Sequence, residues 1–146
     1  MVRAAVAVMV ATVFLVPKVT QAQSNRWEDQ VNNLLKTASK TLADKGYKQT
    51  HEAKTGSLHN SESESFTLEL DGGTDYAIVG VCDNDCDDID LRLFNDDGDE
   101  VDSDTKTDDV PIVVASPRKT SKYRIKVIMA SCKTSPCWYG IGVYGK

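Results

Sequence analysis

Short segments in which apolar and polar residues alternate, separated by turn signals, fill the chain from Phe66 onward. An alternation of period two places successive side chains on opposite faces of a strand, so each segment can bury one face against a core. The sequence predicts strands over residues 66–70, 74–82, 88–94, 100–103, 110–115, 121–130 and 137–144. Short strands at such regular spacing indicate a mainly β fold, an antiparallel β-sandwich or jelly-roll-like domain over residues 66–146.

A helical period precedes these strands. Apolar residues recur at intervals of three and four between Asn25 and Gly46, namely Trp27, Val31, Leu34, Leu35, Ala38 and Leu42. Asn25 followed by Glu28 is a capping-box-like start, and Gly46 is a C-terminal stop. We expect one N-terminal α-helix over residues 23–46 that packs on the sandwich; the alternative is a helix that offers its apolar face to a partner protein.

The polar segment 47–65 holds both histidines, His51 and His59, and is expected to connect the helix to the sandwich, with room for a first edge strand. A hydrolase needs a nucleophile beside a base that a third group orients, and the sequence shows no such arrangement. Glycoside hydrolysis needs a carboxyl whose pKa is raised in an apolar pocket, whereas the aspartates of this chain occur in hydrophilic loops. We therefore expect no enzyme, and a small hydrolase is the weakest alternative.

The first 22 residues have the layout of a secretory signal peptide. Arg3 supplies the basic start, residues 4–16 are apolar except for Thr12, and small residues precede a cleavage point after Ala22. The apolar run is shorter than the roughly 20 residues that span a bilayer. We expect a secreted or periplasmic protein that has no membrane anchor after cleavage.

The mature chain is acidic. Cleavage after residue 22 removes Arg3 and Lys18 from the 17 basic residues and leaves 15 against 22 acidic residues, a net charge of −7. Such a surface repels phosphate backbones, so nucleic acid is not an expected partner. The remaining length suits one domain with one core.

Four cysteines form two pairs that are close in sequence, Cys82 with Cys86 and Cys132 with Cys137. An even number of cysteines in an exported chain indicates disulfides, and we expect these two pairs to be bonded. If successive strands alternate in direction, both pairs lie at one end of the sandwich, so crossed pairing such as Cys82 with Cys132 stays open. A zinc site is the alternative, disfavoured by the oxidising compartment and the absence of nearby histidine.

Thirteen acidic residues lie between Asp83 and Asp109. Strand alternation places the loops 83–87 and 104–109 at the same end of the sandwich. Carboxylates in flexible loops are suitable ligands for calcium. The charge of a bound calcium ion would also screen the repulsion between the carboxylates and allow them to lie close together. The candidate calcium ligands are Asp83, Asp85, Asp87, Asp88, Asp104 and Asp108. The alternative is a solvated acidic surface that keeps the protein soluble.

The string YAIVGVCDNDCDDIDL at residues 76–91, the turn at 95–98, Pro111 and the segment 123–127 resemble the bacterial pre-peptidase C-terminal domain. The resemblance covers residues 66–144. It implies a jelly-roll-like β-sandwich of a kind commonly appended to secreted proteases, where it aids substrate binding or export. Some collagenase members of that family bind calcium and collagen. This chain departs from the family pattern in carrying a helix, not a protease domain, before the sandwich.

These expectations combine into an exported, non-catalytic binding or accessory module with no certain cofactor and with an unidentified protein or carbohydrate as its ligand. An interaction protein that docks a partner through the N-terminal helix is the second hypothesis. Five aromatic residues could form a ligand platform or fill the core: Tyr76, Tyr123, Trp138, Tyr139 and Tyr144.

Overall fold

The computed structural model describes the backbone of residues 20–146 and the side chains of residues 26–146. Within this range one helix, α1 (Thr20–Ala43), precedes nine strands. The strands are β1 (Lys48–Gln49), β2 (Lys54–Leu58), β3 (Ser63–Leu70), β4 (Tyr76–Cys82), β5 (Cys86–Phe94), β6 (Glu100–Asp104), β7 (Ile112–Ala115), β8 (Ser121–Cys132) and β9 (Cys137–Gly145). The predicted fold class, a β-sandwich preceded by one helix, is confirmed.

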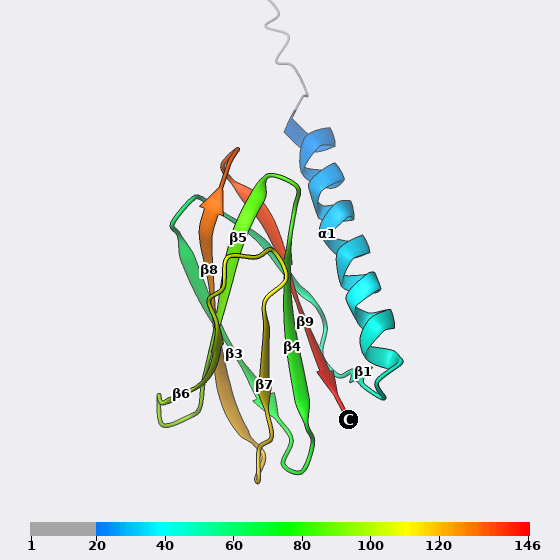
Figure 1. Ribbon diagram of the computed structural model, residues 1–146, viewed down its shortest axis with the longest axis vertical. Coiled ribbons are helices and arrows are strands. Elements are labelled where there is room, and N and C mark those ends of the chain that lie inside the picture. The colour runs from blue at the N-terminus through cyan, green and yellow to red at the C-terminus, as the bar shows by residue number, and fades with distance from the viewer. Residues whose placement is uncertain (1–19) are drawn as a thin grey trace, which may run out of the picture.

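The strands form two antiparallel sheets that pack face to face (Figure 1). Sheet A has the order β1-β9-β4-β7, with β2 also paired to β9, and sheet B has the order β3-β8-β5-β6. The inward-facing residues of both sheets make one core, to which β5 contributes Ile89, Leu91 and Leu93. These three side chains are fully buried, while the intervening residues of β5 face outward, as the alternation predicts.

Helix α1 forms a third layer on the outer face of sheet A, where it runs beside β4 and β9 (Figure 1). Val31, Leu35 and Leu42 are buried against the outward side chains of β4. Gly140 of β9 permits this close approach, because a Cβ atom there would lie 2.6 Å from Val31 Cγ1 and 2.8 Å from Leu35 Cδ1. The predicted packing of the helix on the sandwich is therefore observed.

The ends of α1 differ from the prediction. The helix begins at Thr20, so it continues through Asn25, and the expected cap at that residue was wrong. It ends at Ala43, and Gly46 follows with φ +87° in a C-terminal turn in which the Tyr47 amide donates to the Leu42 carbonyl over 3.1 Å. The predicted signal peptide falls mostly on residues 1–19, which lie outside the described residues.

The segment 47–65, expected as a connector with room for a first edge strand, contributes strands to the sandwich. It contains β1, β2 and the first residues of β3, and β2 pairs along its whole length with β9. The sequence of β2, KTGSL, has little apolar alternation to reveal a strand, because only Leu58 is buried. Gly56 is required there, since a Cβ atom would lie 2.8 Å from the hydroxyl of its cross-strand partner Tyr139.

Candidate functional site

Two disulfides close one end of the sandwich. Cys82–Cys86 joins β4 of sheet A to β5 of sheet B, and Cys132–Cys137 joins β8 of sheet B to β9 of sheet A. Cys86 and Cys132 are direct partners on neighbouring strands, so the two bridges lie side by side. Both predicted pairs and their shared position are confirmed, and every cysteine is bonded. Two disulfides indicate an oxidising, extracellular-type environment.

Asp83 is a buried carboxylate that organises this disulfide end. One oxygen accepts the Trp138 amide at 2.8 Å and the other accepts the Asp85 amide at 3.1 Å. Burial raises the pKa of Asp83, although the amide bonds act in the opposite direction. The side chain therefore joins the β4–β5 loop to the start of β9 and has its oxygens committed to the backbone.

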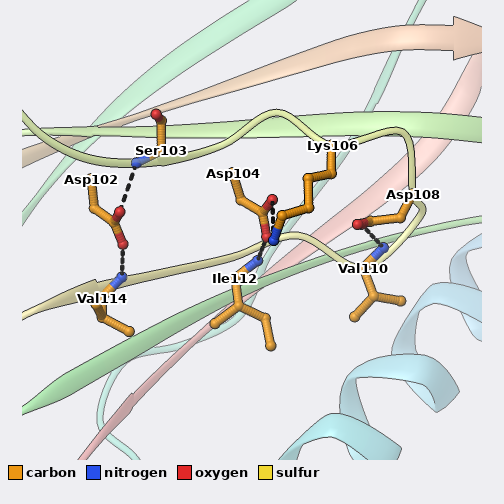
Figure 2. A network of polar contacts seen from close by, with 8 residues as sticks. All are labelled: Asp102, Ser103, Asp104, Lys106, Asp108, Val110, Ile112 and Val114. Atoms are coloured by element: carbon orange, nitrogen blue, oxygen red, sulfur yellow. Dashed lines mark hydrogen bonds and ion pairs between the residues drawn. The ribbon is translucent and has the colours of Figure 1, made fainter.

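A row of aspartates bonds the edge of sheet B to the edge of sheet A (Figure 2). Asp102 and Asp104 are the cross-strand partners of the inward-facing Leu93 and Leu91, so their side chains point across the gap between the sheets. Asp102 accepts the Val114 amide at 2.7 Å, and Asp104 accepts the Ile112 amide at 3.0 Å. These carboxylates accept hydrogen bonds from the backbone N–H groups on the edge of β7 that no strand of the described chain pairs with.

Asp108 continues the same row in the loop between β6 and β7, where it accepts the Val110 amide at 3.1 Å (Figure 2). Its own carbonyl accepts the Ile89 amide at 3.1 Å, which holds the loop against β5. The exposed side chain of Lys106 forms an ion pair with the largely buried Asp104 carboxylate at 3.8 Å. The loop is also held to sheet A, because the Gly80 amide of β4 donates to the Pro111 carbonyl over 2.9 Å.

The six candidate calcium ligands do not form a calcium cage. Asp83, Asp104 and Asp108 accept backbone amides, and Asp87 pairs with Lys133. In the part of the chain that the structure describes, no group of three or more His, Cys, Asp or Glu side chains is arranged to hold a metal ion. The donor set therefore does not fit the six to eight oxygen ligands that calcium takes.

The sequence did not single out Asp90, which lies on the outer face of β5 near Asp88. One carboxylate oxygen of each residue is buried without a hydrogen-bond partner among the described residues. Burial is the main cause that raises the pKa of Asp90, and the charge of Asp88 adds to it, followed by the charges of Asp104 and Asp108. Arg92 opposes the shift.

Each histidine is held by hydrogen bonds. The ring of His51 bonds through Nε2 to the Glu69 carbonyl at 2.9 Å and through Nδ1 to the Thr50 hydroxyl. His59 Nδ1 lies 3.1 Å from the Ser135 hydroxyl, a pairing of serine and histidine that the sequence did not predict. That hydroxyl also accepts the Asn60 amide at 3.0 Å, so it belongs to the turn structure. In the described part of the chain, no side chain bonds to the second nitrogen of His59.

Of the two roles considered for the aromatic residues, the ligand platform is not assembled. Tyr76, Tyr139 and Tyr144 are buried, and Trp138 and Tyr123 lie on different sheets. The hydroxyl of Tyr139 bonds to Glu64, and burial followed by this hydrogen bond raises the pKa of the phenol. The tyrosines therefore serve mainly as core residues with a satisfied hydroxyl.

Two hollows lie between α1 and strands of sheet A. A polar hollow of about 550 Å³ lies on the β1–β2 side and is lined by Asp29, Asn32, Lys36 and other residues. An apolar groove of about 270 Å³ lies on the β7 side. Its lining residues are Leu34, Thr37, Ala38, Thr41, Leu42, Lys45, Val79, Val81, Val110 and Ile112. We name the second hollow the α1–β7 groove, and it is the candidate binding site because its apolar wall is exposed.

No model of a known protein family matches the chain, and no curated protein matches it either. The resemblance to the pre-peptidase C-terminal domain therefore stays a prediction. Over residues 20–146, none of the helical structure is both long and apolar enough to cross a membrane.

Proposed function

We propose that this chain is an exported, non-catalytic binding or accessory module. The observation that carries the proposal is that the residue types which usually perform covalent or acid–base chemistry are engaged in structural bonds. All four cysteines are in disulfides, and both histidine rings are hydrogen-bonded to neighbouring turns or strands. Several aspartates accept backbone amides, so they act as supports for loops and not as free bases.

Export is supported by the two disulfides and by the signal-like layout of the first 22 residues. Cell fractionation followed by intact mass measurement tests this part. We expect the protein outside the cytoplasm, beginning near Gln23, with no thiol reactive toward an alkylating agent after denaturation. A reduced protein in the cytoplasm that retains residues 1–22 would contradict it.

The absence of catalysis is tested on the one Ser–His contact that the structure shows. The exported chain and a Ser135→Ala variant are assayed on ester, peptide and glycoside substrates. We expect equal background rates for both proteins, because the Ser135 hydroxyl serves the turn of residues 59–62. A turnover that the variant loses would establish a hydrolase and remove the proposal.

The second hypothesis is that a partner protein binds the apolar face of the helix. In this structure sheet A already covers that face. Val31 and Leu35 are almost fully buried on sheet A, so a partner could reach them only after α1 leaves the sheet. Leu34, by contrast, is 36% exposed and lines the α1–β7 groove. A binding role therefore finds better support in the groove than in the buried face of the helix.

A further inference from the structure

The outer face of β7 is apolar and uncovered by any described residue. Ile112 and Val114 are the cross-strand partners of Val79 and Ala77, so their side chains lie on the same outer face that α1 covers farther along the sheet. Ile112 is 45% exposed and Val114 is 54% exposed. With Leu34 on the facing side of α1, they border the α1–β7 groove. A contiguous apolar surface of this kind marks an interaction site.

The edge of β7 is closed to strand addition, which determines how a partner can bind. The Ile112 and Val114 amides, which a further strand would pair with, already donate to Asp104 and Asp102. A partner must therefore lie on the face of β7, in the groove beside α1. A helix is about 10 Å wide and strands are about 4.8 Å apart, so one helix covers about two strands. Because α1 covers β9 and β4, a second helix laid parallel to it would cover β7.

The charges around the groove select a basic partner. Figure 2 shows the carboxylates of Asp102, Asp104 and Asp108 on one side of the segment 110–114 and the apolar side chains on the other. The exposed Asp109 adjoins this row, and Lys106 pairs with Asp104 of the row. Lys45 lines the groove at the C-terminal end of α1, so the negative charge is concentrated on the β6–β7 side. The net charge of −7 expected for the mature chain adds long-range attraction for cations.

We infer that the α1–β7 groove binds a basic amphipathic helix of a partner protein, with apolar side chains in the groove and lysines or arginines toward the β6–β7 loop. This inference rests on the proposed function as a binding module and specifies its partner. An anionic membrane or a second acidic copy of this chain would face repulsion at the same surface. Helix-in-groove recognition is a general mode in which an apolar face supplies the affinity and charge supplies the selectivity.

The test uses the exported chain as purified and three synthetic peptides of about five helical turns. The first carries leucines on one face and lysines on the other, the second has the same composition in scrambled order, and the third has glutamates in place of lysines. Fluorescence anisotropy measures each dissociation constant. We expect the first peptide to bind at least about tenfold more tightly than the other two, a difference of about 1.4 kcal/mol.

A matched pair of variants separates the groove from general attraction to an acidic protein. Ile112→Ser removes an apolar side chain from the groove, whereas Val101→Ser removes one of nearly equal exposure, 44%, from β6 outside the groove. We expect Ile112→Ser to weaken binding of the first peptide about tenfold and Val101→Ser to leave it unchanged. Asp109→Asn should reduce the salt dependence of binding. Thermal melts check that all three variants remain folded.

Three results would overturn the inference: no binding of the basic amphipathic peptide, equal binding of the scrambled or acidic peptide, or equal effects of Ile112→Ser and Val101→Ser. Two further measurements address other occupants. Flotation with phosphatidylglycerol vesicles or a dimer in sedimentation, either one abolished by Ile112→Ser, would assign the groove to a membrane or to a second copy. Failure of these peptides leaves the export and non-catalytic character untouched, because those are measured by fractionation and by the substrate assays.

Discussion

The two halves of the outer face of sheet A differ in what covers them. On β9, Gly140 lets α1 come close, Gly142 makes room for the ring of Tyr144, and α1 packs against Val79 and Val81 of β4. On β7 the outward residues are β-branched and exposed. Both halves are apolar, yet only the first has a cover within the described chain.

This difference shows that helix cover is specified by the backbone as well as by hydrophobicity. A helix comes close to a strand that has glycine on its outer face, because no Cβ atom holds it away. Tyr144, at the end of the same strand, adds a hydrogen bond from its hydroxyl to the Leu35 carbonyl at 3.3 Å. The outward residues of β7 have side chains in place of glycine and do not contact α1 as closely. Their apolar side chains are therefore accessible to a binding partner.

The largest effect is expected from the covered half. Leu35→Ala should lower the free energy of unfolding by about 2–5 kcal/mol, because a buried leucine leaves a cavity between helix and sheet. Leu34→Ala, at the adjacent helix position facing the groove, should cost about 1 kcal/mol or less, since that side chain is partly exposed. Urea unfolding of the two variants measures both. Equal losses of unfolding free energy in the two variants would contradict the distinction between the covered and the exposed half of sheet A.

A smaller effect on stability is expected at the edge of β7. Asp102→Ala removes the acceptor of the Val114 amide and should lower stability by about 1 kcal/mol. It should also promote aggregation, because it frees an edge N–H of β7 for pairing with another chain. Asp97→Ala, in the exposed turn between β5 and β6, is the control that removes equal charge. Light scattering measures aggregation and urea unfolding measures stability. If the two variants do not differ in either measurement, Asp102 does not have this role.

The smallest effect concerns Asp90 and depends on pH. Burial raises the pKa of this carboxyl in the folded state, so its ionised form is less favourable there than in the unfolded chain. The stability that protonated Asp90 supplies is present below its unfolded pKa, about 3.9, and is lost as the pH rises through the folded pKa. Asp90→Asn should therefore be more stable than the parent at pH 7, with the advantage shrinking toward pH 4. Urea unfolding of both proteins at pH 7 and at pH 4 tests this prediction. An Asp90→Asn variant that is less stable than the parent at pH 7 would contradict the raised pKa of Asp90.

The sequence predicted the strands well wherever alternation was strong, as in β5 and β8. It missed β2, because a strand that has one buried residue and pairs through its backbone leaves no apolar pattern. The disulfide pairs followed from the short spacing of the cysteines in the sequence, and their shared end of the sandwich followed from strand direction. The role of the aspartates could not be predicted, because the hydrogen bond from the Val114 amide to Asp102 depends on how the two sheets align, and side-chain spacing does not reveal that alignment. The groove was equally hidden, because its existence depends on which strands the helix covers.

Among the residues that the structure describes, α1 forms an integral layer over β9 and β4, and nothing covers the outer face of β7. Native-state hydrogen exchange at single-residue resolution tests this arrangement most directly. We predict that the amides of residues 31–42 exchange with the same free energy as those of the core of β9, that is, only through global unfolding. Exchange of the α1 amides at a much lower free energy, while β9 stays protected, would show that the helix leaves the sheet on its own and would contradict this arrangement.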